Sequence, residues 1–175
     1  MVNMLLFQVG WFVCLLNGSL AALGYTLCVL LLHSIFMQHS WREWYLFGAM
    51  ALTGTLWDGL LSSLGLIQFL PAGVILLPPI ALAPVWLVCL WVLFATTVNH
   101  SLYWLSAYPR VAILLAATVA PISYYAGVKL GAAHLSPPPW RGLLAIALGW
   151  GFVVPWALIF CRRYCRPDKN HTLYR

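Results

Sequence analysis

The stretch WYLFGAMALTGTLWDGLL, from Trp44 to Leu61, decides the fold class, because it contains a single formally charged residue, Asp58. The chain has only three acidic residues, and the other two, Glu43 and Asp168, flank hydrophobic segments. A carboxylate at membrane depth is costly, so it usually faces a partner, a cavity or a substrate. Asp58 is therefore the residue that points most directly beyond a purely structural role.

The composition around this stretch is that of a membrane protein. Hydrophobic residues make up 63% of the 175 positions and charged residues only 7%, whereas a soluble domain carries about 25% charged residues. We therefore expect an all-α, polytopic transmembrane bundle, with a single transmembrane domain over 1–161 and a basic cytoplasmic tail over 162–175. Nucleic acid is excluded as a partner because no basic domain is present to bind it.

Membrane helices of about 20 mostly apolar residues divide the domain. On that measure we expect six spans, over 3–17, 19–38, 44–64, 84–106, 110–132 and 141–161. The first two are separated by Asn17, Gly18 and Ser19, which form a good turn and predict a tight helical hairpin. A five-span arrangement, with the first pair merged or one of the two interfacial, is the alternative.

The orientation follows from the distribution of lysine and arginine in short loops. With both termini inside, seven of the nine basic residues lie on the inner side and two on the outer side. This bias predicts an N-in, C-in topology, and the basic tail is expected to attract anionic headgroups. The inner residues are Arg42, Arg110, Arg162, Arg163, Arg166, Lys169 and Arg175, and the outer ones are Lys129 and Arg141.

The uncharged segment 66–83 is irregular in sequence, because it holds Pro71, Pro78 and Pro79. Eighteen residues interrupted by two adjacent prolines cannot cross the membrane twice. Irregular backbone at membrane depth survives only where protein or water satisfies its polar groups. The segment is therefore a re-entrant, cavity-lining hairpin or an apolar loop on the outer interface, and we favour the loop.

Depth along the helices suggests a partner for Asp58. With about 1.5 Å of rise per residue, Asp58 and Lys129 both fall in the outer half of the membrane. An ion pair between them is one hypothesis. In the alternative, Lys129 extends to the interface and Asp58 accepts hydrogen bonds from hydroxyls such as that of Tyr124. Near Lys129, Pro121 is expected to kink the helix, and glycines are expected to let neighbouring helix backbones approach closely. The supporting residues are Tyr124, Tyr125, Gly127 and Gly131.

A second polar set falls near the inner side. It could be a headgroup site, a proton relay or a metal site, but we favour interhelical hydrogen bonds, worth about 0.6 kcal/mol each. No metal or other cofactor is expected, and a haem between two histidines is allowed by depth alone. The members of the set are Gln8, His33, Glu43, Asn99 and His100.

Known catalytic machinery is not evident, so no catalytic residues are assigned. Intramembrane aspartyl proteases need two membrane aspartates, and these spans hold one. The chain contains no HExxH zinc motif and no glycine-rich phosphate loop. A function other than catalysis is favoured.

Several separate motifs also occur in a recognisable order. They are Phe7-Gln8-x-x-Trp11-Phe12, Glu43, Asp58-Gly59-Leu60-Leu61 with Gly65, Pro84-x-Trp86 with Leu90-Trp91, and Pro121-x-Ser123-Tyr124-x-Ala126-Gly127-x-x-Leu130-Gly131-Ala132. Together, over about 3–160, they resemble an uncharacterised family of short bacterial inner-membrane proteins, domain of unknown function number 2878. The resemblance implies a multi-pass protein of the bacterial inner membrane and carries no activity.

Three functions remain open. The favoured one is a protein that binds a lipid or a small apolar ligand, or that supports a partner membrane protein. A small proton-coupled transporter using Asp58 is the first alternative, since buried carboxylates often titrate at unusual pH. For this function we expect a homo-oligomer, because six short spans show no internal repeat. A lipid-modifying enzyme, using Asp58 with Lys129 or His100 with Glu43, is the second.

Overall fold

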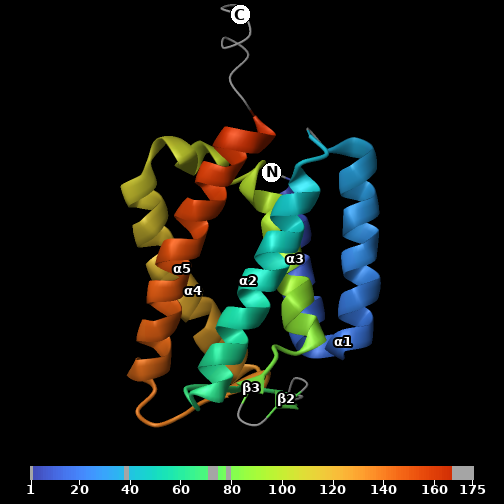
Figure 1. The fold of residues 1–175 in the computed structure, drawn as a ribbon. Coiled ribbons are helices and arrows are strands. Elements are labelled where there is room, and N and C mark those ends of the chain that lie inside the picture. Colours follow the sequence, from blue (N-terminus) through green and yellow to red (C-terminus); the bar gives the residue numbers. More distant parts are fainter. Residues whose placement is uncertain (1, 38–39, 71–74, 78–79, 167–175) are drawn as a thin grey trace, which may run out of the picture.

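The computed structural model is a bundle of long helices with two short strand pairs at one end (Figure 1). It describes residues 2–37, 40–70, 75–77 and 80–166. The prolines at 71, 78 and 79, Asp168 and the basic residues 169 and 175 lie outside these ranges. The predicted all-α class is confirmed. The helices are α1 (Val2–Phe36), α2 (Glu43–Ser63), α3 (Val85–Val98), the 3₁₀ turn η1 (Tyr103–Ala107), α4 (Pro109–Lys129), α5 (Trp140–Phe160) and the π turn η2 (Cys161–Cys165).

Helix α1 turns back on itself at Gly18, where φ is 75° and ψ is −179°. This backbone conformation is open essentially to glycine alone. The two halves pack against each other, since the Tyr25 hydroxyl donates a hydrogen bond of 2.8 Å to the Leu6 carbonyl. The turn expected at Asn17–Ser19 is therefore present, and α1 is a helical hairpin.

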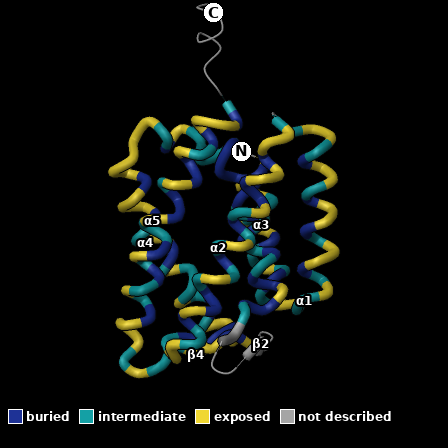
Figure 2. Tube along the Cα trace, in the orientation of Figure 1, coloured by how far each residue is buried: buried dark blue, intermediate teal, exposed yellow. Residues whose placement is uncertain are grey.

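Three helices of the described residues are long and apolar enough to cross a membrane. They are Val2–Phe36, Pro109–Lys129 and Trp140–Cys165, while α3 is a shorter apolar helix. Side chains on the outer faces support a membrane setting, because Leu20 is 85% exposed and Phe152 is 74% exposed. Figure 2 shows exposed and buried positions alternating along each helix, as expected where one face meets lipid. Six spans and the N-in, C-in orientation go beyond these observations.

The helix expected over 84–106 ends early, at Val98. The hydroxyls of Thr96 and Thr97 bond to carbonyls three residues earlier, which competes with the helical backbone pattern. Turns follow, with the Leu102 amide donating to the Thr97 carbonyl at 2.9 Å. The chain then enters η1, so the predicted single helix is wrong beyond Val98.

Four short strands lie at the end of the bundle where α1 turns (Figure 1). β1 (Ile67–Phe69) pairs antiparallel with β4 (Ala133–Leu135), and β2 (Ile75–Leu77) pairs with β3 (Ile80–Ala81). The described part of segment 66–83 therefore forms strands, which neither sequence alternative included. The pairing β1–β4 joins the chain after α2 to the chain after α4.

The helices pack as two groups, which meet where α2 contacts α5. Helices α1 and α2 both pack on α3, while α4 packs on α5. The Asn3 amide donates to the Thr96 carbonyl at 2.9 Å and fixes the start of α1 against the end of α3. Helices α2 and α5 meet where Trp57 covers Gly149. The space that these contacts leave lies between α1, α3 and α4.

Candidate functional site

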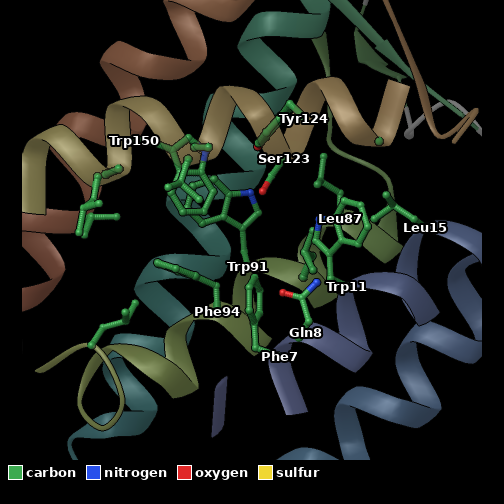
Figure 3. Close-up of a pocket in the computed structure, with 18 of the residues that line it drawn as sticks. Phe7, Gln8, Trp11, Leu15, Leu87, Trp91, Phe94, Ser123, Tyr124 and Trp150 are labelled. Atoms are coloured by element: carbon green, nitrogen blue, oxygen red, sulfur yellow. The ribbon is translucent and has the colours of Figure 1, made fainter. Parts of the chain in front are cut away.

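A cavity of about 360 Å³ occupies that space (Figure 3). Its lining residues recur every three or four positions on each helix, so each helix turns one continuous face toward it. On α1 they are Met4, Phe7, Gln8, Trp11 and Leu15, and on α4 they are Ala112, Leu115, Ala116, Val119, Ala120, Ser123, Tyr124 and Gly127. The β1–β4 end contributes Phe69, Ala132 and Ala133, which close the cavity there.

One wall of the cavity is aromatic. Trp91 of α3 stacks on Trp150 of α5 with ring centroids 4.4 Å apart and an interplanar angle of 18°. Phe94 meets Trp150 edge-on at 4.9 Å, and Phe7 meets Phe94 edge-on at 5.7 Å. These offset-stacked and edge-to-face geometries are the favourable ones for aromatic pairs. The wall is therefore a connected set of rings drawn from α1, α3 and α5.

Polar side chains facing the cavity are few. Gln8 and Ser123 line it from α1 and α4, and both are visible in Figure 3. Within the described residues the Gln8 amide makes no hydrogen bond, whereas the side chains of Asn3 and Tyr25 on the same helix both do. Gln8 therefore offers a free donor and acceptor to whatever enters.

The cavity opens sideways between α1 and α4. Its exposed lining residues are Met4 and Gln8 on α1 and Leu115 and Val119 on α4. Toward the strand end the two helices approach, because a Cβ on Gly127 would lie 3.3 Å from a methyl carbon of Leu15. The mouth therefore faces the lateral surroundings of the bundle.

Asp58 lies directly behind the cavity wall and is fully buried. Its Oδ2 accepts a hydrogen bond of 2.7 Å from the Trp91 indole, and its Oδ1 accepts one of 2.8 Å from the Tyr124 hydroxyl. Both donors also line the cavity. The carboxylate of α2 thus holds two wall side chains, one on α3 and one on α4.

The predicted ion pair between Asp58 and Lys129 is not formed. Within the described residues every ion pair involves Glu43, and the Lys129 ammonium lies 5.2 Å from the ring centroid of Tyr125. The alternative in which the Tyr124 hydroxyl bonds Asp58 is the one the structure shows. Tyr125 is on the outer face, and Gly131 has a φ of 81° in the turn that leads into β4.

Four of the five residues expected near the inner side meet at Glu43. Its Oε2 accepts hydrogen bonds from His33 Nε2 at 2.7 Å and His100 Nε2 at 3.1 Å, while its Oε1 accepts one from Asn99 Nδ2 at 2.7 Å. The fifth residue, Gln8, is not part of this cluster and faces the cavity. We call the four residues the Glu43 cluster.

The Glu43 cluster balances a buried acid with hydrogen-bond donors. Glu43 is fully buried and precedes the apolar stretch 44–64. Burial alone would raise the pKa of its carboxyl, but the hydrogen bonds from His100, His33 and Asn99 outweigh burial and hold that pKa below its usual range. Through these hydrogen bonds Glu43 ties together the end of α1, the start of α2 and the turn after α3.

Two arginines also connect the segments at the end of the bundle that holds the Glu43 cluster. The sequence analysis used them only to predict the orientation. The Arg166 guanidinium donates to the Asn99 carbonyl at 2.8 Å and lies 4.4 Å from the Tyr103 ring centroid. Arg42 donates to the Tyr164 carbonyl at 3.2 Å. Backbone carbonyl partners leave no sequence signal, so these contacts could not be expected from composition.

A family model described as "Protein of unknown function (DUF2878)" matches residues 1–156. The chain belongs to this family. The matched residues include the whole cavity lining, Asp58 with its two partners and the Glu43 cluster, so the resemblance seen in the sequence is confirmed. No curated protein and no solved structure matches the chain. The family is uncharacterised, so the chemistry must be inferred from the site.

Proposed function

We propose that this protein is a multi-pass membrane protein that holds a lipid chain or a small apolar membrane molecule in the cavity between α1, α3 and α4. The observation that carries the proposal is the cavity itself: about 360 Å³, largely apolar, and open sideways between two helices. Ligand sites are typically concave and apolar with a few placed polar groups, and here those groups are Gln8 and Ser123.

The arrangement of charge supports a six-pass topology with both termini inside. The α1 hairpin supplies two passes and α2 to α5 supply four. The contacts Arg42–Tyr164 and Arg166–Asn99 bring the start of α2 and the ends of α3 and α5 to one end of the bundle. Lys129 and Arg141 flank β4 at the other end. The positive-inside rule then assigns the arginine-rich end to the cytoplasm of a bacterial cell.

The lining limits the chemistry of the ligand. The Tyr124 hydroxyl donates its proton to Asp58, so the amide of Gln8 and the hydroxyl of Ser123 remain to orient a polar group. The indole N–H groups of Trp86 and Trp150, two further lining residues, also have no hydrogen-bond partner among the described residues. The aromatic wall suits a flat or unsaturated apolar body, which can pack on ring faces and edges. The ligand class is therefore an apolar molecule with one or two hydrogen-bonding atoms, such as a carbonyl or hydroxyl. Exposed Arg162 and Arg163 would contact anionic headgroups at the inner surface.

The position of Asp58 favours a structural role over proton-coupled transport. Its two oxygens are both engaged by wall side chains, and the carboxylate does not itself line the cavity. Binding, rather than catalysis or transport, is accordingly the function that we test.

A matched pair of variants on α4 tests the proposal. Val119→Trp would fill the cavity mouth, whereas Leu114→Trp would add the same ring on the outer face, where Leu114 is 65% exposed and is not part of the lining. The protein is reconstituted in lipid nanodiscs with a photoactivatable unsaturated fatty acid, and crosslinked peptides are identified by mass spectrometry.

We expect crosslinks on the lining face of α1 and α4 in the wild type and in Leu114→Trp. Val119→Trp should lose most of them, by tenfold or so if the site is blocked. Crosslinks confined to the outer faces, or equal labelling of the two variants, would refute the proposal. Lipid extracted from the purified wild type then identifies the natural occupant.

A further inference from the structure

The Glu43 cluster has the composition and the geometry of a metal site. His33, Glu43 and His100 each offer one ligand atom, and these three atoms all lie within 4.8 Å of one another. Among the described residues this is the one group of at least three His, Cys, Asp or Glu side chains placed in this way. The three residues come from the end of α1, the start of α2 and the turn after α3, so the fold rather than a sequence motif assembles them.

Two imidazoles and one carboxylate favour a particular class of ion. Zinc and similar divalent transition metals bind this nitrogen and oxygen set, with three protein ligands and one open position. Magnesium and calcium prefer oxygen ligands alone. A tetrahedral ion with bonds of about 2.0–2.1 Å spaces its ligand atoms roughly 3.3 Å apart. Glu43 Oε2 already lies 2.7 Å from His33 Nε2 and 3.1 Å from His100 Nε2, so small side-chain movements would suffice.

Surrounding groups hold the ligands in place. Asn99 donates to the second carboxylate oxygen of Glu43, which fixes the orientation of the carboxylate. His33 meets Phe47 edge-on with ring centroids 5.2 Å apart. Such contacts around the ligands orient metal sites, and their loss typically weakens metal affinity about 10- to 100-fold.

Hydrogen bonding within the cluster is also incomplete. Asn99 Oδ1 is buried and has no hydrogen-bond partner among the described residues, and the same is true of His33 Nδ1. A buried polar atom without a partner is uncommon and costs free energy. Asn99 Oδ1 retains the capacity to accept a hydrogen bond from a water molecule on a bound ion. An ion would enter past His100, whose side chain is 10% exposed while those of His33 and Glu43 are 1% exposed.

We propose that His33, Glu43 and His100 bind one divalent transition-metal ion at the inner end of the bundle. The ion would take the place of the two hydrogen-bonding protons that now converge on Glu43 Oε2. It would fasten three segments that meet at this end and leave a fourth position for water or an anionic group. The sequence led us to expect no metal, and the site does not depend on the ligand cavity.

Metal binding by purified protein tests the proposal. The wild type in detergent is stripped with a chelator and equilibrated with Zn²⁺ or Co²⁺, and bound metal is measured by mass spectrometry and by the visible absorption of Co²⁺. The variants are His100→Ala and Glu43→Gln, which removes the charge but keeps the shape. His134→Ala is the matched control, because His134 is exposed on β4 at the opposite end.

We expect about one equivalent of metal in the wild type and in His134→Ala, with an affinity at least tenfold weaker in His100→Ala and Glu43→Gln. X-ray absorption of the zinc-loaded wild type gives a measure that does not depend on the folding of either variant, and it should show two imidazole ligands and no sulfur. Equal binding by all four proteins would overturn the proposal. So would the lack of stoichiometric zinc in the wild type, or zinc held by sulfur and lost in a Cys161→Ser, Cys165→Ser double variant.

Discussion

The indole N–H of Trp91 donates a hydrogen bond of 2.7 Å to Asp58, and the same indole ring forms part of the cavity wall. The contact links a buried carboxyl group on α2 to an aromatic surface on α3. Because the second oxygen of Asp58 holds Tyr124 of α4, one carboxylate positions two walls at once. Stability and cavity shape should therefore change together when this residue is altered.

Replacement of Asp58 should destabilise the protein in a defined order. Asp58→Ala leaves the Trp91 and Tyr124 donors buried without an acceptor, at a cost of about 1–3 kcal/mol for each group. Asp58→Asn keeps one carbonyl oxygen, and the Tyr124 hydroxyl can turn to accept from the amide. Thermal unfolding in detergent, followed by tryptophan emission, should rank wild type above Asp58→Asn and Asp58→Asn above Asp58→Ala. An unchanged unfolding temperature in Asp58→Ala would contradict the role of Asp58 in holding Trp91 and Tyr124 in place.

The hydroxyl of Tyr124 should matter where that of Tyr125 does not. Tyr124→Phe removes a hydrogen bond and leaves a buried oxygen of Asp58 without that donor, at a cost of about 1–3 kcal/mol. Tyr125→Phe deletes a hydroxyl on the outer face, where the ring is 44% exposed, and should be nearly neutral. The two variants remove the same hydroxyl group at adjacent positions. Equal unfolding temperatures for both would show that the Asp58–Tyr124 bond contributes nothing.

Gly54 on α2 should not tolerate a side chain. A Cβ there would collide with the Trp91 ring, whereas a Cβ on Gly48 of the same helix meets open space. Gly54→Ala should therefore displace Trp91 and cost about 1–3 kcal/mol, as overpacking does. Gly48→Ala should be neutral or slightly stabilising, since alanine favours helix. Unfolding temperatures and photolabelling of the cavity should both fall in Gly54→Ala only, and a fall in Gly48→Ala would point to general sensitivity of α2.

The turn in α1 depends on Gly18. Gly18→Ala forces a residue with a Cβ into a backbone conformation reserved for glycine, at a cost of about 1–3 kcal/mol. Gly24, on the second half of the hairpin, has ordinary helical backbone and nothing within 4 Å of a Cβ. Gly24→Ala should stabilise the helix by about 0.5–1 kcal/mol. Opposite shifts in the unfolding temperature are expected, and shifts of the same sign would show that the turn is not under this constraint.

Height within the bundle could be predicted from the sequence, because helical rise converts residue number into depth. The turn at Gly18 follows from the turn residues Asn17–Ser19. Depth alone places His33, Glu43, Asn99 and His100 at the same end of the bundle, where they meet. Apolar length likewise predicts helices in the right places.

The direction in which each side chain points could not be predicted. A separation of five residues turns a helix by about 500°, which leaves two side chains roughly 140° apart. Asn3 faces α3 while Gln8 faces the cavity, and Tyr124 faces Asp58 while Lys129 faces outward. The two residues of each pair lie at similar depth, yet their side chains face different parts of the structure.

The pairing of β1 with β4 was also out of reach, since it joins three-residue segments 66 positions apart in register at Gln68 and His134. Strands this short carry almost no periodic signal. Their partners are set by where α2 and α4 end.

The sideways mouth between α1 and α4 determines how an occupant would exchange. A molecule entering between Gln8 and Val119 would come from within the bilayer and would never need to dissolve in water. Occupancy would then follow the mole fraction of that molecule in the membrane, so even a compound with negligible aqueous solubility could saturate the protein. Exchange rates would respond to the fluidity and composition of the surrounding lipid rather than to salt or solution volume.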